Sequence, residues 1–454
     1  MFQTHSMNEK IKLFLTIFFP ILVTQVSFYL ISFFDTVMSG RAGAIDLAGV
    51  GVGSSLWMPV YTGLSGILLA VAPIVAQALG ARDHKQIQQT LFQGIYLAIA
   101  ISVGTILFGL LFVPTAIEKM GLSDEGKRIA TYYLFALGFG VLPMFLFNVL
   151  RTLMDALGKT RVSMILILLG LPINVGLNYI FIFGKLGVPA FGGIGAGIAS
   201  SLTYWFLFFL AFGFVRNGKP FRNYQFLRVP ERMVWLKQKE LLQLGAPIGL
   251  AIFAEVSIFA AVTLLLSSYG DHIVAAHQAA INFASFVYML PLSASSALTI
   301  VVGYELGARR LKDAVRYAKI GIALCLAVSL FSGALLFWQN EQVAAIYTND
   351  ARVIELASHF MIFAVFFQLS DAVAAPIQGI LRGFKDVNVT LVLSLIAYWV
   401  IGLPLGYTLA ELVGIGPDGY WIGLIAGLAA GAVLLFIRLV WIVRRYDPAT
   451  LSKA

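Results

Sequence analysis

Long runs of apolar residues dominate this chain and limit what it can fold into. They recur from about residue 13 almost to the C-terminus, and each is long enough to cross a bilayer core of roughly 30 Å. Only 12% of the residues are charged, against about 25% in a typical soluble domain. A transmembrane β-barrel would instead show alternating segments of roughly ten residues. The pattern predicts an all-α polytopic membrane protein.

Gly, Pro and Asn residues divide the apolar runs into twelve predicted transmembrane helices. Their expected ranges are 11–38, 47–76, 90–113, 129–150, 161–183, 193–215, 239–268, 276–305, 315–338, 353–380, 389–411 and 419–442. The first run is too long for the apolar region of a cleaved signal peptide, so we expect it to remain as the first helix. The single cysteine, Cys325, excludes an internal disulfide.

The basic residues predict how these helices are oriented. If the N-terminus lies inside, all but six of the 31 Lys and Arg residues fall in inside segments, as the positive-inside rule requires. The six outside are Arg41, Lys119, Lys127, Arg128, Lys185 and Arg352. We therefore expect both termini in the cytoplasm. The net charge of +9 then reflects topology, and no nucleic-acid partner is expected.

The two halves of the chain repeat each other at an offset of 227 residues. LGAR occurs at 79–82 and again at 306–309, and the same offset pairs Pro20 with Pro247. Each half holds six predicted helices, so both halves have the same orientation, and such parallel repeats are a transporter architecture. We predict an N-terminal six-helix lobe at 1–220, a cytoplasmic linker at 221–238 and a C-terminal six-helix lobe at 239–454.

Three carboxylates interrupt the predicted helices: Asp35, Glu255 and Asp371. Glu255 sits in LAIFAEVSIFAAVTLLL, at 250–266, too far from both ends of its helix for the side chain to reach water. At the offset of 227, none of the three pairs with another acidic residue. A charge deep in a bilayer is costly and usually marks a pathway for an ion or a substrate.

These carboxylates are candidate coupling residues. A carboxylate in apolar surroundings can exchange a proton near neutral pH, and it can also join neutral oxygens around Na⁺. We therefore place cation or proton coupling at Glu255, Asp371 and Asp35, with a Na⁺ site at Glu255 and Asp371. The alternatives are a structural hydrogen bond to a neighbouring helix and, for Asp35, a place at the outer rim.

Several amides accompany these acids in the predicted helices. Each can line a substrate cavity or join two helices by hydrogen bonds. Gln368 precedes Asp371 by three residues, so the two share a helix face. The other amides are Asn174, Asn178, Gln278 and Asn282.

Motifs that would indicate an enzyme or an ATP-driven pump are absent. The sequence has no G-x-x-x-x-G-K-[ST] loop for phosphates, no H-E-x-x-H and no G-x-S-x-G. We expect a protein that is not an enzyme and has no cofactor.

Four stretches, in order along the chain, indicate a family. They are DTVMSGR at 35–41, VAQALGAR at 75–82, QGILRGFKDV at 378–387 and YWVIGLPLGY at 398–407. Together they resemble the multidrug and toxic compound extrusion (MATE) family, and Glu255 within AIFAEVSIF resembles its NorM-type bacterial branch. The resemblance implies a monomeric antiporter in the lipid of a bacterial inner membrane. Such a protein exports amphipathic cationic drugs or dyes as Na⁺ or H⁺ enters, and contributes to antibiotic resistance.

The resemblance also assigns roles to residues. Asp35 matches the N-terminal-lobe aspartate, and Glu255 and Asp371 match the C-terminal-lobe acidic pair for cation binding. Asn178 replaces an aspartate of the DinF-type branch, which leaves Asp35 as the only deep carboxylate of its lobe. Phe367 stands where NorM-type descriptions have a tyrosine, so a hydroxyl ligand is missing there.

Three other functions stay open. A flippase for lipid-linked precursors can share the twelve-helix plan, but it needs basic residues facing the cavity, and almost none lie deep in the predicted helices. An intramembrane transferase would need a DDxxD motif or a His–Asp pair, and neither is present. A passive channel would fail to transport a substrate uphill.

Overall fold

The computed structural model describes residues 4–219, 221, 224, 226–227 and 230–446. Within this part of the chain the ordered elements are all helical, without a β-strand. Twelve helical stretches in it are long and apolar enough to cross a membrane. The predicted fold class is therefore confirmed. The ends of the predicted lobes and parts of the predicted linker, at 222–223, 225 and 228–229, lie outside the described residues.

The first half of the chain forms six of these spans, since α2 and α3 together make one. Its helices are α1 (Met7–Ala42), α2 (Ala44–Leu68), α3 (Val71–Gly80), α4 (His84–Glu118), α5 (Asp124–Ala156), α6 (Thr160–Phe183) and α7 (Gly193–Asn217).

The second half forms the other six spans. Its elements are α8 (Trp235–Leu266), η2 (Ser267–Tyr269), α9 (Asp271–Gly307), α10 (Leu311–Tyr347), α11 (Ala351–Gly383), α12 (Val387–Leu395), η3 (Ile396–Gly402), α13 (Leu403–Tyr407), η4 (Thr408–Leu412) and α14 (Pro417–Tyr446).

The chain packs as two compact units. The N-terminal unit is Phe19–Gly249, and the C-terminal unit is Leu250–Ala454 together with Met1–Phe18. Helix α1 contributes to both, because its first turns, as far as Phe18, pack with the C-terminal unit. Lys10 anchors these turns there: its ammonium lies 3.1 Å from the Asp313 carboxylate and donates to the Thr4 hydroxyl at 2.8 Å.

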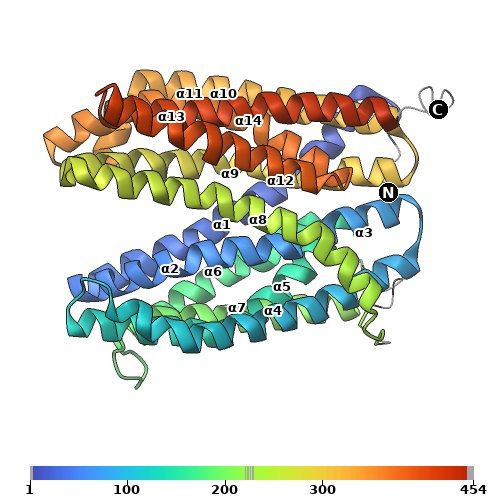
Figure 1. Cartoon of the computed structure of the whole chain (residues 1–454). Helices are drawn as coiled ribbons and strands as arrows, with labels where there is room; N and C mark the ends of the chain where they lie inside the picture. The colour runs from blue at the N-terminus through green and yellow to red at the C-terminus, as the bar shows by residue number, and fades with distance from the viewer. Residues whose placement is uncertain (1–3, 220, 222–223, 225, 228–229, 447–454) are drawn as a thin grey trace. The chain divides into compact units, whose positions relative to one another are not determined.

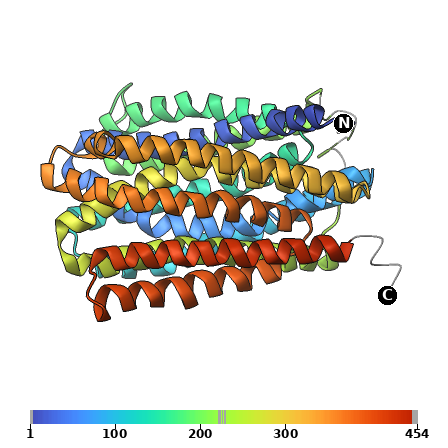
Figure 2. The ribbon, with the colours of Figure 1, turned by 90° about the horizontal axis from the view of Figure 1, so that it is seen from above.

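One helix lies at the centre of each unit. Helix α5 packs against α2, α4 and α7, and α11 packs against α9, α10 and α14. Figures 1 and 2 both show α10, α11 and α14 running side by side within the C-terminal unit. Both central helices form the fourth span of their half of the chain, as expected if the two halves repeat one fold.

Several observed helices extend beyond their predicted ends, and three of the predicted ranges also contain or adjoin an irregularity that was not predicted. The range 47–76 is broken between α2 and α3 at Leu69 and Ala70, and α10 continues past its predicted end at 338 through a kink at Gln339. The range 389–411 contains the π-helical turns η3 and η4. Pro404 explains η3, because its ring would clash with the carbonyl of residue 400 in a regular α-helix.

Glycines allow α14 to touch the backbone of the preceding span. Gly419, Gly423, Gly427 and Gly431 follow one another at intervals of four residues, so they share a face of α14. A Cβ added at Gly423 would lie 2.6 Å from the Gly402 carbonyl oxygen, and one added at Gly427 would lie 2.8 Å from that of Ala397. Small residues make such close helix pairs in membranes.

A side chain at Gly423 should therefore disrupt the C-terminal unit. We expect Gly423→Val to lower the free energy of unfolding by about 1–3 kcal/mol, because the neighbouring backbone cannot yield to the new side chain. The measurement is the thermal unfolding midpoint of purified protein in detergent. Gly104→Ala is the control, since a Cβ there would meet nothing within 4 Å; this variant should be as stable as the parent or more stable. Equal stability of Gly423→Val and the parent would contradict the close packing.

Candidate coupling sites

Asp35 is the centre of a buried polar cluster in the N-terminal unit. Its side chain on α1 is 8% exposed, and two helices supply its partners. The Asn178 amide of α6 donates to Oδ1 at 2.6 Å, and the Ser200 hydroxyl of α7 donates to Oδ2 at 2.5 Å. The carboxylate is therefore held by neutral donors on two helices, α6 and α7.

Asn174 and Asn178 share a face of α6 and belong to this cluster. The Asn178 amide nitrogen also donates to the Asn174 side-chain oxygen at 3.1 Å, and Asn174 donates to Ser200 at 3.4 Å. The side-chain oxygen of Asn178 is buried and has no hydrogen-bond partner among the described residues. The cluster can therefore offer carboxylate, amide and hydroxyl oxygens to a cation or to a protonated carboxyl.

Glu255 and Asp371 meet in the C-terminal unit. Glu255 projects from the middle of α8, and the Tyr288 hydroxyl of α9 donates to its Oε1 at 3.3 Å. Asp371 of α11 is 5% exposed, and its carboxylate is close enough to interact electrostatically with that of Glu255. The structure thus places within electrostatic range of each other the two acids that the family resemblance assigns to a pair.

Tyrosine hydroxyls and the Arg382 guanidinium lie within electrostatic range of Glu255. Tyr398 of η3 is buried and lies within electrostatic range of both carboxylates. The neighbouring Trp399 indole donates to the Ala254 carbonyl at 3.1 Å, which attaches η3 to α8 beside Glu255. A narrow pocket opens here, lined on the acidic side by Glu255 and elsewhere by apolar and aromatic side chains of α8, η3 and α14.

Lysine and arginine form no salt bridge with Asp35, Glu255 or Asp371 within the described part of the chain. Asp371 also has no hydrogen-bond donor there. No group of three or more His, Cys, Asp or Glu side chains among the described residues could hold a metal ion. A Na⁺ at the acidic pair would therefore need hydroxyl, amide or backbone oxygens in addition to the two carboxylates.

The predicted amides occupy different environments. Gln368 is 5% exposed, and neither its side-chain nitrogen nor its oxygen has a partner among the described residues. Phe367, beside it, packs edge-on against Phe259 at 5.5 Å between ring centroids. Gln278 and Asn282 lie one turn apart on α9 and are exposed in the C-terminal unit. They share an exposed face, and their place along a substrate cavity stays a prediction.

Ser200, Tyr288 and Tyr398 were not predicted as site residues. Ser200 carries no distinguishing pattern, because hydroxyl residues are common in apolar helices, and Tyr398 begins the stretch YWVIGLPLGY, which indicated the family but no role for this residue. Tyr288 did carry a signal. It continues a polar stripe along α9, with Gln278, Asn282 and Ser285 at intervals of three or four residues.

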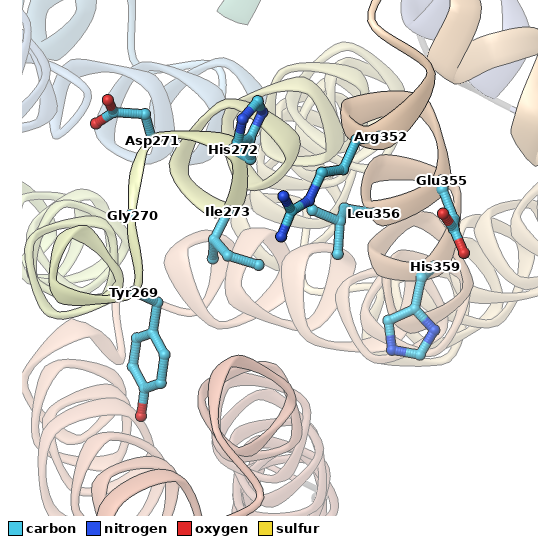
Figure 3. A pocket seen from close by; sticks show the side chains of 9 residues that line it. All are labelled: Tyr269, Gly270, Asp271, His272, Ile273, Arg352, Glu355, Leu356 and His359. Atoms are coloured by element: carbon cyan, nitrogen blue, oxygen red, sulfur yellow. The ribbon is translucent and has the colours of Figure 1, made fainter.

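A wider pocket lies elsewhere in the C-terminal unit, where η2 leads into α9 and α11 begins (Figure 3). Ile273, Arg352 and Leu356 lie close together in its middle, and the Asp271 side chain points away. Its lining residues fall within 269–273 and 352–359, so no predicted coupling residue contributes to it. Of the predicted coupling residues, Glu255 lines the narrow pocket described above.

Comparison with known proteins identifies the family. The MatE family profile matches twice, at residues 20–180 and 247–408. The two matches begin 227 residues apart, the offset at which LGAR repeats. The probable multidrug resistance protein NorM of Oceanobacillus iheyensis is 53% identical and covers 98% of this chain and 100% of the relative. The protein of the same name from Bacillus subtilis is 52% identical and covers 98% of both chains.

Solved structures have the same fold. A eukaryotic MATE transporter, AtDTX14, superposes with a TM-score of 0.89 at 19% identity and covers 97% of this chain and 98% of its own. An outward-facing multidrug resistance MATE family transporter gives a TM-score of 0.87 at 20% identity, with 96% and 97% covered. The profile and the full-length relatives show that the chain belongs to the MATE family of membrane transporters, which are not enzymes, and to its NorM-type bacterial branch.

Proposed function

We propose that this transporter exports amphipathic organic cations in exchange for Na⁺ or H⁺ by alternating access. One observation supports this most strongly. Glu255 and Asp371 lie close together on two membrane-spanning helices, and no lysine or arginine forms a salt bridge with either. Two carboxylates in such a setting repel each other and are poorly solvated, so a cation or proton from solution is strongly favoured there.

Exchange of the organic cation for Na⁺ or H⁺ follows if both bind to the same carboxylates, so that the arrival of one displaces the other. The narrow pocket beside Glu255 has room for about one water molecule. An amphipathic cation therefore needs a wider opening between the helices before it can place its charge near Glu255 and its apolar body against aromatic side chains. A proton or Na⁺ arriving at the carboxylates neutralises them and weakens the hold on the substrate. The Tyr288 hydroxyl, which donates to Glu255, then orients the carboxylate for whichever species occupies it.

Asp35 is proposed as a second coupling group in the N-terminal unit. Its donors, Asn178 and Ser200, are neutral, so an ionised Asp35 keeps its full negative charge and can receive a cation or a proton. The unpartnered oxygen of Asn178 lies beside it as a further ligand. Because residue 178 is an asparagine here, the N-terminal unit lacks the second proton acceptor that an aspartate at this position would supply.

The remaining proposals concern organisation. We infer functional lobes at 1–220 and 239–454 joined by a cytoplasmic linker at 221–238, both termini in the cytoplasm, a bacterial inner-membrane location and a monomer. The excess of Lys and Arg in the proposed inside segments supports the orientation.

Neutral replacements of the acidic pair should abolish coupling. In Glu255→Gln and Asp371→Asn, we expect the rate of dye efflux from proteoliposomes to fall at least about tenfold, the consequence of losing 1.4 kcal/mol or more of charge interaction. Glu125→Gln is the control, because Glu125 is exposed and pairs only with Arg128 on the same helix; efflux should not change. If Glu255→Gln and Asp371→Asn both insert normally into the membrane and both export dye at the parent rate, Glu255 and Asp371 are excluded as coupling groups.

The driving ion can be identified by separating the gradients. Dye export from proteoliposomes is measured twice: once with an imposed Na⁺ gradient at constant pH, and once with an imposed pH gradient in the absence of Na⁺. We expect one of the two gradients to drive export of the dye against its own concentration gradient. The ion whose gradient drives export is the coupling ion. Export that only ever runs down the dye gradient, whichever ion gradient is imposed, would identify a passive channel and reject antiport.

A further inference from the structure

Arg382 lies near the acidic pair and has an incomplete set of partners. It is the penultimate residue of α11, and its Nη2 donates to the Ser295 hydroxyl of α9 at 2.5 Å. Its Nε is buried and has no hydrogen-bond partner among the described residues. A guanidinium has five N–H donors, so Ser295 satisfies only a part of what it can offer.

The backbone beneath Arg382 is fixed by direct contact between α9 and α11. A Cβ added at Gly379 would overlap the backbone of Ser295, and the Thr299 hydroxyl donates to the Gly379 carbonyl at 2.9 Å. The helices cannot separate here without losing these contacts. Movement of the positive charge must therefore come from the flexible Arg382 side chain.

The guanidinium interacts electrostatically with Glu255 without forming a salt bridge to it. Four charged or titratable groups interact with Glu255 from the packed elements: Tyr288 of α9, Asp371 and Arg382 of α11, and Tyr398 of η3. Arg382 is the only cation among these four, and it also interacts with Tyr288. No nitrogen of Arg382 lies within the 4.0 Å of a salt bridge to Glu255.

The repeat shows an arginine reaching the same position in the other half. At the offset of 227, Phe28 is the counterpart of Glu255. Arg151 of α5, the central helix that corresponds to α11, lies over the Phe28 ring at 5.5 Å and within 3.9 Å of Asp155. At the same offset Arg151 pairs with Gln378 and Arg382 with Asp155, so the two arginines are not counterparts in the repeat. Each half nevertheless carries an arginine of its fourth span near this position, and only the C-terminal half has a carboxylate there.

We propose that Arg382 is a positioning residue for coupling, a built-in counter-charge that alternates between Ser295 and the ionised Glu255. The inference rests on the proposed function. While a cation or proton occupies Glu255, the guanidinium remains on Ser295. When that species leaves, Arg382 turns to Glu255 and reduces the cost of an unpaired charge in the membrane. Arg382 therefore competes with the coupling ion and promotes its release.

Two substitutions should act in opposite directions on the protonation of Glu255. The readout is the infrared band of the protonated Glu255 carboxyl, assigned by its loss in Glu255→Gln and followed against pH. In Arg382→Gln the band should persist to a pH about one unit higher, equivalent to tenfold tighter proton binding, because a positive charge no longer favours the carboxylate. In Ser295→Ala it should disappear at a lower pH, because the guanidinium is released towards Glu255. Arg382→Lys should restore most of the parent behaviour.

Three results would overturn the proposal. They are an unchanged titration in Arg382→Gln, a shift in the same direction in Arg382→Gln and Ser295→Ala, and an equal shift in Arg151→Gln, which removes a guanidinium from the other half. The titration is independent of transport. If Glu255→Gln exports dye normally while Arg382→Gln shifts the band, the counter-charge stands and the proposed coupling role fails.

Discussion

Negative charge inside apolar helices is the constraint on which the rest of this structure depends. Ionised groups are costly in a membrane unless a partner or a mobile ion balances them. Asp35 is held by an amide and a hydroxyl, and Glu255 by a tyrosine hydroxyl. These neutral donors position the carboxylates without neutralising them. A protein built in this way can bind positive species from solution, and the proposed exchange of one cation for another uses that property.

The packing explains how such groups are kept in place. The central helices α5 and α11 each pack against several neighbours, and α11 carries both Asp371 and Arg382. Glycines bring α14 against η3 and α11 against α9 by backbone contact. These contacts leave little freedom to the helices within a unit, so changes at the acidic pair must be made by side chains, ions and the substrate. Closely packed helices that carry carboxylates of variable occupancy are compatible with the proposed alternating-access transport.

The fold was largely predictable, because hydropathy and helix breakers act locally. The twelve spans follow from apolar runs, and the kink at Gln339 falls where the predicted helix 315–338 ends. The π-helical turns of the range 389–411 were not predicted, because they depend on accommodating Pro404 against a neighbouring helix.

The site was predictable only where residue type was unusual. Asp35, Glu255, Asp371 and Asn178 are conspicuous in apolar helices, whereas Ser200 is one of many hydroxyl residues and gains its meaning from a contact with a distant helix. Arg382 was missed because the predicted helix 353–380 ended before it, so it was counted among the charges that determine topology. Helix α11 continues to Gly383, and this places the guanidinium beside the acidic pair.

Competition between ions and substrate tests the central claim most directly. Purified protein in detergent should be titrated with a fluorescent organic cation at several pH values without Na⁺, and at several Na⁺ concentrations at constant pH. If both positive species use the same carboxylates, the apparent Kd of the dye must rise as the concentration of the coupling ion rises, and protons or Na⁺ must be released when the dye binds. A dye affinity that is independent of both pH and Na⁺ would contradict the account.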